Sequence, residues 1–391
     1  MLRLRPNKLA TFLARHPWVL AKSLESQSNG LTDGQVVDVV AANGRFVARG
    51  VYNSKSHIRA RLYTWNEQEL LDGEFWRRRI ESAVQMRVDL GYDDPAGASR
   101  LVFSEADGLS GLIVDRYGEW LVVQVTALAI DRRIDEIVAL LVERLRPRGV
   151  FVRTDAKIAV AEGMTVRDGL VWGEAPAGPV AIRENGLQFS ADLLGGQKTG
   201  MYLDQRENRR VAAGYCRGRR VLDVCCYVGG FSLAAARLGQ ATHVLGIDAS
   251  EKAVEQARAN AVANGIENVN FEVGECFETL ERLRDSGERF GAIVLDPPRF
   301  AGSRHGVDQA LRAYFRLNRL AVETLEPGGY LITCSCSGRV TRDDFLHMLA
   351  GVSQKTGRDL QVLEPRGPAP DHPVRLSCPE TDYLKCYICR A

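Results

Sequence analysis

Two short polar segments each follow an apolar run in the C-terminal half of the chain. Asp296 begins the first segment, Asp-Pro-Pro-Arg-Phe, which comes directly after Ala292–Leu295. Cys336 lies in the second, Ser-Cys-Ser-Gly, directly after Tyr330–Cys334. If both runs are parallel strands, the segments lie at their carboxyl edge, where open α/β folds bind ligands. A carboxyl group and a thiol could there serve acid–base and nucleophilic chemistry.

The residue types of these segments suggest a role for each. Pro297 and Pro298 fix the backbone after Asp296 and stop it from continuing as strand or helix. A rigid Asp296 could pair with a ring nitrogen or an exocyclic amino group of a nucleobase, and an ordinary strand-ending turn is the alternative. Cys334 shares a strand face with apolar residues, so we expect it to be packed. Cys336 falls beyond the strand and could project into the cleft as a nucleophile.

A third candidate element is a glycine-bearing turn between a strand and a helix. Val221–Val224 reads as a buried strand, two glycines begin at Gly229, and a helix is predicted over Ser232–Leu238. Such glycines would let a ligand approach the backbone without meeting a Cβ. The turn lacks the G-x-G-x-x-G of dinucleotide binders, which argues against a pyrophosphate ligand. Asp248 follows the next apolar run, a position at which an acidic residue can bind ribose hydroxyls. The combination resembles class I S-adenosylmethionine methyltransferases, with an ordinary turn and a solvated Asp as the alternative.

The composition indicates a globular chain of more than one domain, with 391 residues of which 45% are hydrophobic and 26% charged. No run reaches the roughly 18 apolar residues of a transmembrane helix, and the basic N-terminus lacks the apolar segment of a signal peptide. We therefore expect a cytoplasmic protein without membrane contact, in which nine cysteines argue against a disulfide framework. Cys386 and Cys389 form a CxxC in a strand-like run, where they point to opposite faces, so no metal site is predicted.

The N-terminal segment is basic and rich in strand-like runs. Residues 1–65 contain ten Lys or Arg and three acidic residues. Val36–Val40 and Phe46–Tyr52 flank an Asn-Gly turn, and Ile58–Tyr63 alternates, with its arginines expected to face outward. The spacing over residues 33–53 resembles a PUA domain, a small RNA-binding module. A polyanion partner is predicted, with a solvated basic face as the alternative.

The order of these patterns predicts three domains. Residues 1–68 are the PUA-like, β-rich barrel. Residues 69–190 form a small α+β middle domain with a linker helix and a hairpin that turns at Asn185-Gly186. Residues 191–391 alternate strands and helices, which predicts an α/β, Rossmann-like domain with a mixed, mostly parallel sheet. The resemblance of its glycine turn and Asp248 implies a class I methyltransferase domain.

Five motifs in this order resemble the RlmI family of large-subunit ribosomal RNA 5-methylcytosine methyltransferases over nearly the whole chain. They are Gly196–Asn208, Asp223–Ser232, Asp296–Phe300, Ser335–Gly338 and Asp371–Val374. The resemblance implies S-adenosyl-L-methionine as cofactor and large-subunit (23S) ribosomal RNA as substrate. It also implies a reaction in which the Cys336 thiolate adds to C6 of the cytosine while Asp296 polarises the base.

The resemblance further implies which residues contact the cofactor and the substrate. Glu275 and Cys276 stand where the family more usually has Asp and Val. Substrate contacts are implied for Pro297, Pro298 and Phe300. Cofactor contacts are implied for Lys198, Tyr202, Asp204, Gln205, Arg206, Asp223, Cys226, Tyr227, Gly229, Phe231, Asp248, Glu275, Cys276 and Asp296.

Charge by itself leaves several readings of the basic residues before the glycine turn. Lys198 or Arg206 could bind the cofactor carboxylate, as a cation should. A solvated basic surface or an RNA track is the alternative for Arg206, Arg209, Arg210, Arg217, Arg219 and Arg220.

Two other functions remain open from the sequence, and so does a homodimer. An amino-group methyltransferase acting on guanine N2 or adenine N6 could use the same acidic Pro-Pro motif without a thiol. An RNA-binding assembly factor with a vestigial cofactor site is the other. Loss of activity in Cys336→Ala would separate the first from the cytosine enzyme, and binding of S-adenosylmethionine would exclude the second.

Overall fold

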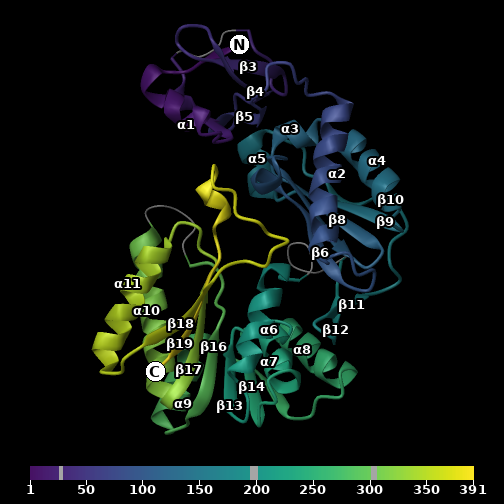
Figure 1. Ribbon diagram of the computed structural model, residues 1–391. Helices are drawn as coiled ribbons and strands as arrows, with labels where there is room; N and C mark the ends of the chain where they lie inside the picture. Colours follow the sequence, from purple (N-terminus) through teal and green to yellow (C-terminus); the bar gives the residue numbers. More distant parts are fainter. Residues whose placement is uncertain (26–29, 194–200, 301–305) are drawn as a thin grey trace. The chain divides into compact units, whose positions relative to one another are not determined.

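The computed structural model describes residues 1–25, 30–193, 201–300 and 306–391, which divide into two compact units (Figure 1). The first unit comprises Met1–Ile182, Ala191–Leu203 and Pro370–Thr381. The second comprises Arg183–Ser190, Asp204–Ala369 and Asp382–Ala391. The predicted domain boundaries after residues 68 and 190 remain a proposal.

The N-terminal part of the first unit is a five-stranded sheet with the order β1-β3-β4-β5-β2. Its elements are β1 (Leu2–Arg3), α1 (Leu9–Leu13), β2 (Trp18–Leu20), β3 (Val36–Val40), β4 (Phe46–Tyr52) and β5 (Ile58–Thr64). The predicted hairpin is present, since β3 pairs with β4 in antiparallel register. Gly44 takes a φ of 84° in its turn, which the missing Cβ permits.

One expectation for this sheet was wrong. Arg61 of β5 does not face outward but is 8% exposed. Its guanidinium lies 3.1 Å from Glu105 and 3.1 Å from Glu162. Two carboxylates contributed by later segments compensate its charge, which is what makes burial of an arginine tolerable.

A second five-stranded sheet of the first unit has the order β10-β9-β8-β7-β6. Its elements are α2 (Gly73–Asp89), β6 (Ala98–Phe103), β7 (Leu112–Tyr117), β8 (Trp120–Val125), α3 (Leu128–Asp131), α4 (Ile134–Leu145), β9 (Gly149–Arg153), α5 (Ala156–Glu162) and β10 (Asp168–Gly173). The helix predicted over residues 69–92 is α2, whose N-cap Asp72 accepts a hydrogen bond from the Phe75 N–H. Side chains from α2 and α4 fill the core against the sheet.

The segment Pro370–Thr381 is tied to this second sheet by polar contacts. Arg87 is completely buried, lies 2.8 Å from Asp107 and donates to the carbonyl of Asp371 at 2.8 Å. The Arg100 N–H donates to the Asp371 carboxylate at 3.0 Å, and His372 Nδ1 lies 2.9 Å from that carboxylate. The Asp371-His372 pair therefore anchors the returning chain.

The second unit contains a seven-stranded sheet with the order β15-β14-β13-β16-β17-β19-β18. The strands from β15 to β17 pair in parallel, and β19 pairs antiparallel with β17 and β18. This mixed, mostly parallel sheet confirms the predicted fold class. The strands are β13 (Arg220–Val224), β14 (His243–Asp248), β15 (Val269–Val273), β16 (Phe290–Leu295), β17 (Leu325–Ser335), β18 (Gln361–Arg366) and β19 (Lys385–Arg390).

Helices cover both faces of this sheet (Figure 1). The helices are α6 (Arg206–Gly214), α7 (Gly230–Arg237), α8 (Glu251–Ala263), α9 (Cys276–Asp285), α10 (Val307–Thr324) and α11 (Arg342–Thr356). Cys386 packs with Ala212 and Phe231, on the side of α6 and α7. Cys389 packs in the other core, on the side of α9 to α11. The two cysteines of the CxxC thus lie on opposite faces, as the period of a strand requires.

The sequence analysis did not predict α6, α9 or β18 of the second unit. β18 contains Pro365, and most of its side chains are exposed, which is the character of an edge strand. α9 follows β15 directly and buries only Thr279, Leu280 and Leu283. The hydrophobic pattern of β18 is weak because no side chain of this strand is buried.

A short hairpin connects the two large sheets along the chain. β11 (Val180–Glu184) pairs with β12 (Leu187–Ala191). Asn185 and Gly186 both take positive φ, 51° and 78°, as the predicted two-residue turn requires.

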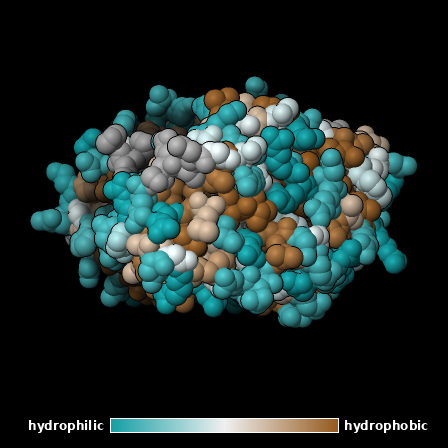
Figure 2. Space-filling model, turned by 90° about the horizontal axis from the view of Figure 1, so that it is seen from above, coloured by the Kyte–Doolittle hydropathy of each residue, from teal (hydrophilic) through white to brown (hydrophobic). Residues whose placement is uncertain are grey.

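Within the described ranges, no helix has the length and apolar character needed to cross a membrane. Figure 2 shows one face of the molecule, on which hydrophobic residues lie between hydrophilic ones. Single exposed apolar side chains, such as Leu376 and Val160, are common on soluble surfaces and mark no interface by themselves.

Candidate active site at the carboxyl edge of the parallel sheet

The carboxyl ends of five neighbouring parallel strands carry most of the predicted site residues. Asp223 lies in β13, and Asp248 is the last residue of β14. Glu275, Asp296 and Cys336 follow β15, β16 and β17 within two residues. Parallel register brings these positions to one edge of the sheet, where ligands of open α/β folds bind.

The turn after β13 is bound to the end of β14. The Cys226 N–H donates to the Ile247 carbonyl at 2.9 Å, and the Tyr227 N–H donates to the Asp248 carboxylate at 2.9 Å. Cys225 and Tyr227 both take positive φ, 63° and 50°. Non-glycine residues in this conformation cost about 1–3 kcal/mol each and cluster at functional sites.

The glycines of this turn are required by the close packing around it. A Cβ on Gly229 would lie 2.9 Å from the Phe271 ring. A Cβ on Gly230 would lie 2.5 Å from Arg209 Nε. Protein atoms therefore occupy the space into which a side chain at either position would project.

Asp223 is a buried carboxyl group with one oxygen engaged. The Ser232 hydroxyl donates to Oδ2 at 2.6 Å, whereas Oδ1 has no hydrogen-bond partner among the described residues. Burial raises the pKa of Asp223 to about 6, against the opposing effect of the Ser232 hydrogen bonds. A buried carboxylate oxygen without a donor suits a cationic ligand group, such as the ammonium of a methionine moiety.

Asp296 is brought together with the predicted residues before α6. Gln205 Nε2 donates to Asp296 Oδ1 at 2.9 Å, and Asn208 Nδ2 donates to Gln205 Oε1 at 2.7 Å. Burial and the nearby Asp204 carboxylate raise the pKa of Asp296 to about 7. Asp204 itself accepts a hydrogen bond from the Tyr383 hydroxyl on Oδ2. A carboxyl group with a pKa near neutrality can donate as well as accept a proton.

The basic residues of α6 divide into buried and exposed ones. Arg209 Nη1 lies 2.9 Å from a Glu184 carboxylate oxygen, and Arg206 Nε lies 3.9 Å from the same carboxylate. All three residues are buried. A solvated surface therefore does not fit Arg206 or Arg209. It fits Arg210 and Arg217, which are exposed, and Arg219 and Arg220 are half-buried. The carboxylate of Glu184, which the sequence analysis did not single out, is the partner that permits this burial.

For two predicted cofactor residues, the structure gives no position relative to this group. Lys198 falls outside the described residues. Tyr202 is half-buried and belongs to the first unit, next to Leu203 at the unit's boundary. Their predicted contacts stay predictions.

The predicted adenine-binding residues differ in their surroundings. Glu275 is exposed and forms the N-cap position of α9. Cys276 is half-buried, and its thiol is hydrogen-bonded with that of Cys225. That hydrogen bond lowers the pKa of Cys276 and raises the pKa of Cys225. Phe231 is buried in the core on the α6 side of the sheet.

Cys334 of β17 and Cys336, which follows the strand, have different environments, as predicted. Cys334 is fully buried, and burial raises its pKa well above the usual value. Cys336 is half-buried and follows Ser335, the last residue of the strand. Tyr314 of α10, which the sequence analysis missed, places its hydroxyl 3.2 Å from Ser337 Oγ and lies within electrostatic reach of both Cys336 and Asp296.

The predicted substrate-binding residues are partly engaged in packing. The ring of Phe300 lies 4.8 Å from that of Tyr314 and 6.5 Å from that of Phe277, between centroids. Pro297 is buried and Pro298 is exposed. Pro298 is therefore the most accessible of the three, and the half-buried Phe300 keeps part of its surface accessible.

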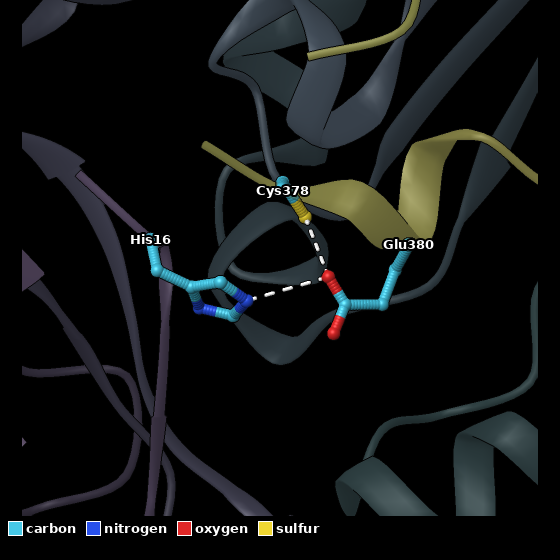
Figure 3. A group of neighbouring side chains, drawn as sticks. All are labelled: His16, Cys378 and Glu380. Carbon is cyan, nitrogen blue, oxygen red and sulfur yellow. Dashed lines mark hydrogen bonds and ion pairs between the residues drawn. The ribbon is translucent and has the colours of Figure 1, made fainter. Parts of the chain in front are cut away.

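Within the described residues, His16, Cys378 and Glu380 of the first unit place potential metal-ligand atoms within 4.8 Å of one another (Figure 3). His16 Nε2 lies 3.3 Å, and Cys378 Sγ 3.5 Å, from the same Glu380 oxygen. The Trp18 N–H donates to His16 Nδ1 at 3.2 Å, so the neutral ring carries its proton on Nε2. A metal ligand would need Nε2 without its proton. The geometry therefore fits a group of three hydrogen-bonded side chains. The hydrogen bond from His16 lowers the pKa of Glu380 to about 2.

Comparison with known proteins identifies relatives over the full length of the chain. The S-adenosylmethionine-dependent methyltransferase family matches residues 170–373, and the PUA-like domain family matches residues 2–65. Ribosomal RNA large subunit methyltransferase I of Aeromonas hydrophila is 38% identical over 384 residues, which cover 97% of this chain and 96% of that protein. The protein of the same name from Shewanella denitrificans is 37% identical and covers 100% of this chain and 98% of its own length.

Solved structures share the same fold. SMU.776, described as a methyltransferase complexed with SAH, has a TM-score of 0.86 at 21% identity and covers 100% of both chains. A second structure, described as an S-adenosylmethionine-dependent methyltransferase from Streptococcus mutans, also has a TM-score of 0.86, at 20% identity.

Proposed function

Because the chain belongs to the family of ribosomal RNA large subunit methyltransferase I, we propose that it transfers a methyl group to C5 of a cytosine in large-subunit ribosomal RNA. S-adenosylmethionine supplies the electrophilic methyl group when bound. The observation that carries the choice of base chemistry is the position of Asp296 and Cys336 after the neighbouring strands β16 and β17. As an enzyme of ribosomal RNA, it would act in the cytoplasm.

The cofactor site is proposed along the same edge of the sheet. Asp223 would hold the methionine ammonium, since its Oδ1 is buried without a partner among the described residues. Asp248 would accept from the ribose hydroxyls while it holds the Tyr227 N–H. The adenine would lie by Glu275 and Cys276. The remaining proposed contacts are those of Lys198, Tyr202, Asp204, Gln205, Arg206, Cys226, Gly229 and Phe231.

The proposed nucleophile is the Cys336 thiolate. It forms a bond to C6 of the cytosine, and the displaced electron pair raises the electron density at C5. C5 then takes the methyl group, a base removes the C5 proton, and the electron pair of that C–H bond expels the thiolate from C6. This covalent route divides one difficult step into easier ones. The target base would have to leave its stack to reach Cys336.

Asp296 is proposed to assist the addition at C6. Its pKa of about 7 lets it hold a proton at neutral pH and donate it toward N3 of the cytosine. That donation offsets the negative charge that thiolate addition places on the ring. Gln205 fixes the orientation of the carboxyl group through its bond to Oδ1.

Nucleoside analysis tests the proposal directly. Full-length protein is incubated with large-subunit ribosomal RNA and isotopically labelled S-adenosylmethionine, and the RNA is digested for mass spectrometry. We expect labelled 5-methylcytosine with the wild-type protein and none with Cys336→Ala. Label on guanine N2 or adenine N6, with activity kept in Cys336→Ala, would instead establish the amino-group enzyme. No S-adenosylmethionine binding in calorimetry would establish the assembly factor.

A further inference from the structure

Lys385 is a buried cation at the start of the apolar strand β19. It is 1% exposed and lies opposite Ser335, the last residue of β17. Its Nζ donates hydrogen bonds to three carbonyl oxygens, those of Ser337 at 2.7 Å, Val340 at 2.8 Å and Tyr383 at 2.8 Å. An ammonium group has three N–H donors, so each of them has a partner.

These bonds fix the turn that carries Cys336. Val340 N–H donates to the Ser337 carbonyl at 3.0 Å and closes the turn. The Tyr314 hydroxyl lies 3.2 Å from Ser337 Oγ. The turn is therefore held from β19 and from α10, and Cys336 directly precedes its first anchored residue.

The same ammonium is positively charged and donates to the carbonyl of Ser337, the residue after Cys336, and it interacts electrostatically with Cys336. Across the described part of the chain, Lys385 forms no ion pair, since the nearby Asp382 pairs with Arg342 at 2.7 Å. Burial lowers the pKa of Lys385 to about 8. The negative charges of Asp382 and Cys336 oppose this shift, and the positive charges of Arg342 and Arg299 add to it. Burying a cation is costly, and the carbonyls of the turn are what compensate it.

We propose that Lys385 is a positioning residue for the nucleophile, which holds the Cys336 turn through three carbonyls and favours the thiolate over the thiol. This rests on the role proposed above for Cys336. A neighbouring positive charge lowers the pKa of a thiol, and a fixed attacking atom lowers the barrier to addition. A Lys385 with a structural role alone would hold the turn without changing the acidity of Cys336.

The test is the pH dependence of Cys336 alkylation by iodoacetamide in the full-length protein without RNA, followed by mass spectrometry of the peptide. We expect the wild-type midpoint to lie below the value of about 8.5 for an ordinary thiol. Lys385→Met should raise the midpoint by about one pH unit and lower kcat for methylation by roughly 10- to 100-fold, with KM and cofactor affinity unchanged. Lys385→Arg keeps the charge and should restore a low midpoint.

Tyr314→Phe is the matched control, because it removes the other anchor of the turn and leaves the ammonium in place. Its alkylation midpoint should equal that of the wild type. Equal midpoints in the wild type and Lys385→Met would overturn the proposal. So would a wild-type midpoint at or above about 8.5, a result that needs no variant to fold. Methylation by Cys336→Ala would instead refute the role of Cys336 as the nucleophile. The alkylation midpoints would still show whether Lys385 lowers the pKa of that thiol.

Discussion

Gln205 Nε2 donates a hydrogen bond of 2.9 Å to Asp296 Oδ1 and so joins two motifs that lie 91 residues apart in the sequence. Asn208 in turn orients the Gln205 amide by donating to its oxygen at 2.7 Å. The bond fixes one oxygen of the carboxyl group and opposes the rise in pKa that burial causes. Burial therefore dominates the pKa of Asp296, and the Gln205 bond at the start of α6 acts against it.

We predict that methylation falls as pH rises above about 7, because the pKa of Asp296 is about 7 and only the protonated form donates to N3. Gln205→Leu removes a bond that lowers this pKa, so the falling limb of kcat should move to higher pH. Asp296→Asn should abolish the limb and lower kcat by roughly 10²- to 10⁴-fold. Steady-state rates between pH 5.5 and pH 9 check this, with Asp285→Asn on the exposed end of α9 as the control. If the falling limb of the pH profile is unchanged in Asp296→Asn, the titration of another group causes that limb.

Asp248→Ala and Asp223→Ala should each weaken S-adenosylmethionine binding, by at least tenfold if each removes a charge-assisted hydrogen bond of about 1.5–3 kcal/mol. Asp248→Ala also releases the Tyr227 and Ser250 N–H groups that its carboxylate holds. Calorimetry with the full-length protein measures both affinities. Asp285→Ala should bind as the wild type does. Wild-type affinity in both site variants would remove the basis for the cofactor site.

The stability of the protein without cofactor should depend on the ionisation of Asp223. Its folded pKa of about 6 lies above the ordinary value, so its favourable contribution is complete below about pH 4 and is lost as pH rises through 6. The loss amounts to at most about 3 kcal/mol. Asp223→Asn keeps an acceptor for Ser232, should remove this slope, and should raise the free energy of unfolding at pH 7. Urea unfolding at pH 5 and pH 7 measures it, and an unchanged slope in the variant would contradict the shift.

A covalent trapping experiment should distinguish the roles of Cys336 and Cys334. With 5-fluorocytosine at the target position, fluorine cannot leave as a cation after methyl transfer, so the adduct persists. We expect that adduct on Cys336, and only in the presence of S-adenosylmethionine. Cys334→Ala should remain active with a stability loss of about 1 kcal/mol from the vacated volume. Peptide mapping that placed the adduct on Cys334 would reverse the assignment.

Exposed basic residues of the N-terminal sheet should contribute to RNA affinity. Truncation is a poor test, because Arg61 and Tyr63 bind Glu105, Glu162 and Ser110 of the same unit. We therefore predict the effect for a variant with alanine at three exposed positions, Arg15, Lys22 and Arg45.

In that triple variant, binding to ribosomal RNA should weaken. The slope of log affinity against log salt should fall by about 0.7–0.9 for each RNA phosphate that the variant no longer neutralises. Filter binding over a range of salt concentrations measures both quantities. Lys355→Ala, at an exposed position of α11, is the control. Unchanged affinity and slope in the triple variant would leave a solvated basic face as the explanation.

The sequence by itself determined the parallel strands of the second unit and the edge at which Asp248, Asp296 and Cys336 lie. Those features follow from short-range patterns: apolar runs of four to six residues, turn residues directly after them, and the end of the strand between Cys334 and Cys336. The roles of these residues remain proposals. The edge strand β18 escaped notice because few of its side chains are buried, so its pattern is weak.

Only the tertiary structure decided which charges are buried and what compensates them. Glu184 pairs with Arg209, and two glutamates enclose Arg61, although nothing near either arginine in the sequence marks it as buried. The three carbonyls around Lys385 and the return of residues 370–381 to the first unit were likewise beyond the sequence pattern. Burial of a charge depends on partners brought from distant segments, and local periodicity carries no information about which segments those are.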